Sequence, residues 1–195
     1  MVVSRSGFFA ARSLGLGGSA QTITNRGGTA AWRSVSLTGV PAADLPPESK
    51  GYTVTRNVYR PDGTDADLRK ARQTDLFAVV IKGVRADASQ SAQTLVVDLL
   101  PAGFEIETAT VSKGRSTTDY SWVPQLTEAS YTEERDDRFV AALDLKEGVK
   151  DFALAYVVRA VTAGEFTYPA LVVEDMYEPE IRGRTAIGKL VVAPR

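Results

Sequence analysis

Residues 151–184 read DFALAYVVRAVTAGEFTYPALVVEDMYEPEIRGR and contain three extended segments in succession. In the first segment, large side chains occupy alternate positions, at Phe152, Leu154, Tyr156 and Val158. This alternation predicts a β-strand with one buried face. A turn at Gly164 leads to a second strand over residues 165–168, and residues 171–173 form a third. Short strands separated by turn residues indicate a β-sheet protein.

The rest of the chain repeats this pattern. Further strands are predicted over residues 19–24, 31–37, 51–59, 75–84, 93–99, 104–111, 131–134, 138–145 and 185–192. We expect residues 93–99 to pair with the strand before them, and residues 65–72 to form a short helical turn. Short strands with a turn about every 8–12 residues are typical of sandwiches. The sequence therefore predicts an all-β fold, an antiparallel β-sandwich.

Large apolar residues at alternating strand positions form the predicted core. They are Phe77, Val79, Ile81, Leu95, Val97, Phe104, Ile106, Phe139, Leu143, Phe152, Leu154 and Tyr156. Each large side chain contributes roughly 1.5–3 kcal/mol when fully buried, so this core can hold a domain without disulfides.

The domain is expected to span residues 19–195. Residues 1–18 are rich in Gly and Ser and are interpreted as a linker or the remnant of a preceding module. The glycines at 15–18 lack the preceding strand and following Lys of a phosphate-binding loop. Residues 40–50 contain three prolines and are expected to form an extended connection.

Composition argues against several functions. The 195 residues include no Cys and no His, which removes thiolate chemistry and the commonest general base and metal ligand. A net charge of -1 gives no field that would attract nucleic acid or an anionic membrane. We therefore expect no catalytic residues, cofactor or metal, and no direct contact with nucleic acid or membrane. An enzyme would need a cleft of Lys or Tyr with acids, which no motif indicates.

Three side-chain groups have two readings each. Asp62, Asp65 and Asp67 could offer oxygens to calcium, but the EF-hand spacing is missing and a capped turn explains them better. The acidic and basic run at residues 133–138 is expected to be a solvated hairpin turn. Trp32 and Trp122 could stack a sugar or base, although one buried tryptophan and one packed in a loop is the ordinary outcome.

The acidic segment after residue 173 carries two bulky side chains, Met176 and Tyr177. Around them stand Glu174, Asp175, Glu178 and Pro179. The pair could fold back over the edge of the sandwich. The polar flanks instead favour a projecting tip that makes a dry contact with a partner, since Met adapts to irregular surfaces and Tyr adds one hydroxyl.

Six ordered motifs support a resemblance. They are ITNRGG (residues 23–28), LTGVP (37–41), GYTVTRNVYRPDG (51–63), VVDLLPAGFEIE (96–107), YTEERDDR (131–138) and YVVRAVTAGEFTYPALVVEDMYEPEIRGRT (156–185). With them the chain resembles the C-terminal macroglobulin-like domain of bacterial alpha-2-macroglobulins. Each motif is weak alone, and the ordered set is specific.

The resemblance implies a non-catalytic domain of a large periplasmic inhibitor of proteases, often a lipoprotein. In that family a protease cuts a bait region, and in many members a Cys–Gln thioester is exposed and acylates the protease. The domain would dock on the thioester domain and neighbouring macroglobulin-like domains of the same chain. Met176 and Tyr177 would form a latch that shields the thioester, with target proteases met through the parent protein. This chain has no Cys, so the thioester would lie elsewhere.

A different class of function stays open. An adhesin-like or carbohydrate-binding sandwich would use Tyr120, Trp122 and the Ser/Thr-rich segment at residues 112–123. Binding of glycans by the isolated domain would distinguish it from a docking domain.

Overall fold

The computed structural model describes residues 24–30, 32, 43–107, 120 and 122–195. The chain divides into two compact units, residues 1–40 and 41–195. In the first unit, the side chain of Asn25 accepts the Gly27 N–H at 2.9 Å and donates to the Thr29 carbonyl at 2.8 Å. Residues 1–18, and nearly all of the strands predicted over 19–24 and 31–37, lie outside the described residues.

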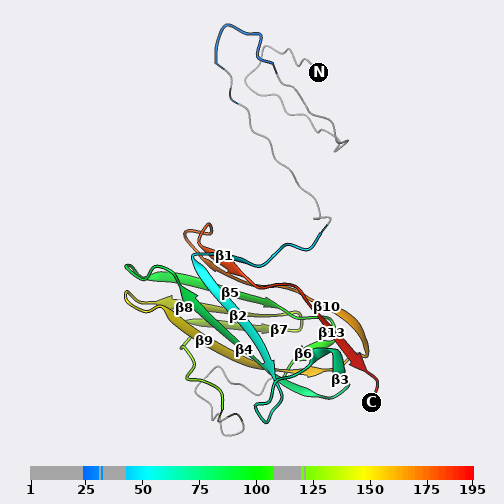
Figure 1. Cartoon of the computed structure of the whole chain (residues 1–195). Helices are drawn as coiled ribbons and strands as arrows, with labels where there is room; N and C mark the ends of the chain where they lie inside the picture. Colours follow the sequence, from blue (N-terminus) through cyan, green and yellow to red (C-terminus); the bar gives the residue numbers. More distant parts are fainter. Residues whose placement is uncertain (1–23, 31, 33–42, 108–119, 121) are drawn as a thin grey trace. The chain divides into compact units, whose positions relative to one another are not determined.

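Two main sheets and a smaller one build the second unit (Figure 1). The six-stranded sheet has the order β1 (Glu48–Lys50), β12 (Arg182–Arg184), β11 (Leu171–Asp175), β5 (Ala92–Leu99), β8 (Arg138–Leu145) and β7 (Tyr131–Arg135). The four-stranded sheet has the order β2 (Tyr52–Tyr59), β4 (Leu76–Arg85), β9 (Asp151–Ala160) and β6 (Phe104–Ile106). The smaller sheet contains β10 (Gly164–Tyr168), β13 (Gly188–Ala193) and β3 (Ala71–Arg72), which follows a 3-10 turn, Leu68–Lys70.

All strand pairs within the two main sheets are antiparallel. The fold predicted from the sequence is thereby confirmed. The hairpin β7–β8 and the predicted strands at residues 51–59 and 75–84 are found with shifts of a residue or two at their ends, and the alternating residues 152–158 lie within β9.

The core lies between the inner faces of the two main sheets. Most of the predicted core is buried there, namely Phe77, Val79, Ile81, Phe104, Phe139, Leu143, Phe152, Leu154 and Tyr156. The ring of Phe139 from the six-stranded sheet stacks on that of Tyr156 from the four-stranded sheet, with centroids 4.5 Å apart. Ile106 is only half-buried and packs at the margin of the core.

The prediction was wrong for β5. Leu95 and Val97 are half-buried on the outer face, whereas Thr94, Val96 and Asp98 are buried on the inner face. The reason is that polar partners on the opposite sheet satisfy Thr94 and Asp98, so these positions need not face water.

The expected pairing of β5 with β4 was also wrong. β4 is paired on both sides, with β2 and with β9, so neither of its edges is free. β5 lies in the other sheet between β11 and β8. The connection over residues 86–91 therefore crosses from one sheet to the other.

The strand β12 was not predicted. Its three residues, Arg182 to Arg184, have no apolar alternation that would identify a strand. Gly183 is required there because a Cβ would lie 2.5 Å from the Tyr52 carbonyl oxygen. The predicted strand at residues 185–192 starts later, at Gly188.

Tyr120, Trp122, Val123 and Leu126 pack against Val80, Ala155 and Val157, on the outer face of the four-stranded sheet. Trp122 lies against Tyr59, with ring centroids 5.0 Å apart, and its Nε1–H donates to the Pro61 carbonyl at 3.0 Å. Tyr120 contacts the same indole edge-on at 6.2 Å. The interpretation of Trp122 as a loop tryptophan packed onto the body is confirmed, whereas the expectation that the other tryptophan is buried was wrong, because Trp32 is fully exposed. No helix in the described part of the chain has the length and apolar character to cross a membrane.

Candidate functional site

The turn between β11 and β12, residues 176–181, is built around one carboxylate. Asp175 Oδ1 accepts the backbone N–H groups of Tyr177 at 2.9 Å and Glu178 at 3.1 Å. The Ile181 N–H donates to the Glu178 carbonyl at 2.7 Å, and the Asp175 N–H donates to the Ile181 carbonyl at 3.0 Å. A side chain that accepts from residues two and three positions ahead organises a turn locally. The tip is therefore a defined loop.

A neighbouring strand end also holds the turn. The Met176 N–H donates at 2.8 Å to the carbonyl of Gln93, which precedes Thr94, the partner of Asp175 on β5. This bond fixes the start of the turn to the sheet while leaving the Met176 side chain free to point outward.

Met176 and Tyr177 both expose their side chains at this tip. The exposed fraction is 43% for Met176 and 81% for Tyr177, the second highest among the large apolar residues described. Of the flanking residues, Glu178 and Pro179 are exposed, whereas Glu174 and Asp175 are half-buried. The arrangement can supply a thioether and a phenol to another surface.

The three aspartates considered for calcium do not form a site. Asp62 Oδ1 accepts the N–H and the hydroxyl of Thr64 at 3.0 and 2.7 Å. Asp67 Oδ1 accepts the Arg69 N–H at 3.0 Å and caps the 3-10 turn. Within the described residues, no three acidic side chains come together in a way that could hold a metal ion. Local caps account for Asp62 and Asp67.

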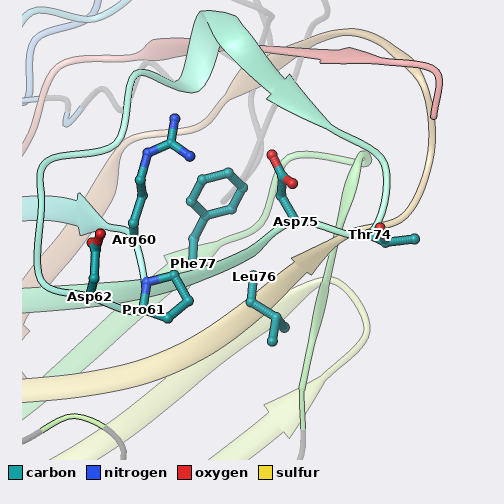
Figure 2. A pocket seen from close by; sticks show the side chains of 7 residues that line it. All are labelled: Arg60, Pro61, Asp62, Thr74, Asp75, Leu76 and Phe77. Atoms are coloured by element: carbon teal, nitrogen blue, oxygen red, sulfur yellow. The ribbon is translucent and has the colours of Figure 1, made fainter.

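A shallow pocket of about 480 Å³ lies between the end of β2 and the start of β4. Figure 2 shows Arg60 and Asp62 on one side, Thr74 and Asp75 on the other, and Phe77 between them. The carboxylates are already engaged, since Asp62 bonds to Thr64 and Asp75 Oδ2 accepts the Arg72 N–H at 2.9 Å. The pocket offers no free pair of acids for acid–base chemistry.

A buried polar network links the two sheets, and sequence reasoning missed it. Arg56 Nη1 lies 2.5 Å from Asp98 Oδ1, and their side chains are 6% and 0% exposed. The Tyr156 hydroxyl donates to Asp98 Oδ2 at 2.7 Å, and the Arg56 guanidinium lies 3.6 Å above the ring of Tyr168. A second bond, between the hydroxyls of Tyr52 and Thr94 at 2.7 Å, crosses the same interface. Only Arg56 gave a signal in the sequence, as a charged residue in the row of larger side chains on β2, because the apolar pattern of β5 put Asp98 on the opposite face from the predicted core residues.

Burial raises the pKa of Tyr156 well above its usual range, and the charge of Asp98 raises it further. Burial likewise raises the pKa of Tyr168, with Asp98 again acting in the same direction. Both hydroxyls therefore stay protonated in the folded domain at pH values where an unfolded tyrosine ionises.

Stability is expected to fall as the pH rises above about 10, the ordinary tyrosine pKa. The unfolded state then loses protons that the folded state keeps, so each buried tyrosine contributes a slope of up to about 1.4 kcal/mol per pH unit. Urea unfolding at several pH values from 9 to 11 measures how the free energy of unfolding changes with pH. Tyr156→Phe should lower the stability at pH 9 yet flatten the slope. Equal slopes in the two proteins would contradict the assignment.

Comparisons with known proteins place the domain. The profile of the family described as "Bacterial Alpha-2-macroglobulin MG10 domain" matches residues 51–180. The alpha-2-macroglobulin of Escherichia coli K12 is 33% identical over 179 residues, which cover 87% of this chain and 11% of that protein. The alpha-2-macroglobulin of Xylella fastidiosa Temecula1 is 30% identical over 171 residues, which cover 83% of this chain and 10% of that protein. The chain thus spans about a tenth of the length of these relatives.

Solved structures are similar as well. Salmonella alpha-2-macroglobulin reacted with methylamine has a TM-score of 0.68 at 34% identity, covering 80% of this chain and 10% of that one. Native E. coli alpha-2-macroglobulin, spanning domain MG7 to the C-terminus, has a TM-score of 0.69 at 32% identity. The match covers 80% of this chain and 25% of that one.

Proposed function

Because this chain belongs to the bacterial alpha-2-macroglobulin family, as a macroglobulin-like domain, we propose that it serves a protease inhibitor by docking on a thioester-bearing domain of the same polypeptide. The homologues are protease inhibitors rather than enzymes, and we propose a non-catalytic role for this domain too. We further propose that it acts in the periplasm, where such an inhibitor would meet foreign proteases.

One observation carries the proposal: a methionine and a tyrosine stand exposed on a turn that is hydrogen-bonded into a defined shape. An exposed apolar pair on an ordered loop is suited to contact with a partner, because such a contact removes the two side chains from water. The turn geometry also limits the entropy lost when the pair docks, because the backbone is already ordered. We call the turn at residues 175–181 the latch turn.

The chemistry of a thioester explains what such a contact would do. Water or an amine attacks the acyl carbon, the carbon–sulfur bond breaks, and a thiolate leaves. The group therefore survives only where nucleophiles are kept out. The Salmonella relative was crystallised after reaction with methylamine, an amine nucleophile, which fits an acyl group open to this attack. The Met176 and Tyr177 side chains would cover such a group in the resting protein.

The test uses the full-length protein that contains this domain. Tyr177→Ala and Met176→Ala are expected to shorten the lifetime of the thioester without protease by at least about tenfold, equivalent to ~1.4 kcal/mol from the barrier. Release of free thiol over time is the measurement. In the 195-residue chain the same changes should alter stability by no more than about 0.5 kcal/mol, because both side chains are exposed.

Tyr131→Ala is the matched control, since Tyr131 is 55% exposed but lies on β7 at the other edge of the same sheet. It should leave the thioester lifetime unchanged. The proposal fails if the latch variants behave like this control, or if methylamine releases no thiol from the unmodified protein.

A further inference from the structure

The strand β1 lies along β12, the strand into which the latch turn leads. Glu48 is opposite Arg184, Ser49 opposite Gly183, and Lys50 opposite Arg182. Figure 1 shows β1 beside this turn at the edge of the six-stranded sheet. β1 is also the first strand of the second unit, so the chain from residue 43 onward reaches the domain through it.

Side chains on β1 bind the outgoing arm of the latch turn. Glu48 accepts from Arg182 through both oxygens, from Nε at 3.0 Å and from Nη2 at 3.2 Å, and lies 3.5 Å from Arg184. Lys50 Nζ lies 2.5 Å from Glu180 Oε2, which is inside the turn. A two-pronged arginine–carboxylate pair fixes orientation as well as distance. The hydrogen bond to Arg182 lowers the pKa of Glu48, so the carboxylate is ionised at neutral pH.

Backbone contacts extend the attachment at both ends of β1. Arg184 donates from Nε and Nη2 to the Pro46 carbonyl, at 3.2 and 2.9 Å. Gly51 has a φ of +96°, and a Cβ there would lie 2.5 Å from Ile181 Cγ2. Glycine thus lets the chain pass directly under Ile181, at the foot of the latch turn.

We propose that residues 46–51 act as a strap that holds the latch turn in its projecting position, with Glu48 and Lys50 as positioning residues. This inference rests on the proposed role of Met176 and Tyr177. One arm of the turn is anchored by β5 through Met176, and the strap anchors the other. The residues that precede β1 are joined directly to the strap. A displacement of those residues would therefore pull on the strap and change the position of the latch turn. Detaching the strap from the sheet would remove at once the groups with which it binds the side chains of Glu180, Arg182 and Arg184.

Hydrogen exchange of the 195-residue chain tests the strap. In the double variant Glu48→Gln/Lys50→Met, the amides of Tyr177, Glu178 and Ile181 are expected to exchange about fivefold faster, as the turn opens locally. Amides in the core strands β4 and β9 should keep their protection, and the melting temperature should fall by at most about 4 °C. Asp175→Ala, which removes the acceptor inside the turn, is the positive control.

Lys70→Met is the matched negative control, because it removes a surface pair, Lys70 with Asp67 at 3.3 Å, on a different part of the domain. It should leave exchange in the latch turn unchanged. A swap provides the rescue: Lys50→Glu should speed the exchange, and adding Glu180→Lys should restore protection. A merely global loss of stability would not be restored by the swap.

Unchanged exchange in the double variant, with the expected response to Asp175→Ala, would overturn the strap. So would a swap that fails to restore protection. These results are separate from the thioester lifetime of Tyr177→Ala. If the strap variants loosen the turn while Tyr177→Ala leaves the lifetime unaltered, the strap stands as a structural device and the latch function fails.

Discussion

Asp98→Ala is expected to destabilise the domain by about 3–5 kcal/mol, the cost typical of breaking a buried ion pair from one side. The change leaves the Arg56 guanidinium, which is 6% exposed, without its carboxylate partner. It also removes the acceptor of the Tyr156 hydroxyl, which lies 2.7 Å from Asp98 Oδ2. Both orphaned groups would stay between the sheets, where water cannot replace the lost acceptor. Urea unfolding followed by circular dichroism measures the loss.

Two variants make this prediction specific. Asp144→Ala removes an exposed aspartate from β8, next to β5, and should change stability by no more than about 0.5 kcal/mol. The triple variant Arg56→Met/Asp98→Leu/Tyr156→Phe removes all three polar groups and should recover most of the loss, because no charge is left unpaired. If Asp98→Ala costs no more than Asp144→Ala, the network does not hold the sheets together.

Gly83→Ala is expected to cost about 1–3 kcal/mol although it adds a single methyl group. Gly83 lies on β4 opposite Phe152 of β9, and an added Cβ would meet the ring at 2.1 Å from Cζ and 2.3 Å from Cε1. Phe152 is 3% exposed and contacts Tyr52 edge-on at 6.5 Å, so its ring has little room to move. The measurement is again the free energy of unfolding in urea.

A double variant tests whether the clash with the Phe152 ring causes the loss of stability in Gly83→Ala. Combining Gly83→Ala with Phe152→Leu should give a smaller loss than the sum of the single changes, with a coupling of about 0.5–3 kcal/mol. Gly188→Ala is the control, since its nearest neighbour is Tyr168 Cβ at 3.5 Å, an ordinary contact. It should be neutral or stabilise by up to about 1 kcal/mol. Strict additivity in the double variant would rule out the steric explanation.

The latch turn could be located from the sequence, but its attachment could not. Met176 and Tyr177 attract notice as bulky residues in an acidic, proline-bounded segment, and the structure places both at an exposed tip. The contacts of Glu48 with Arg182 and of Lys50 with Glu180 join residues 134 and 130 positions apart. No local pattern reports such a distance, because it depends on β1 joining the sheet beside β12.

Alternation of apolar residues was sufficient to predict an antiparallel β-sandwich and most of its core, since strand geometry places every second side chain on one face. In β2 the structure gives the same alternation, since Tyr52, Val54, Arg56 and Val58 form the less exposed row. Alternation misassigned β5, because Leu95 and Val97 are more apolar than Thr94 and Asp98, which in fact face the core. Which face of β5 is buried depends on the side chains that the opposite sheet presents to it. Arg56, Tyr156 and Tyr52 come from the opposite sheet and make burial of an aspartate and a threonine possible, and only the assembled sandwich brings those groups within hydrogen-bond distance.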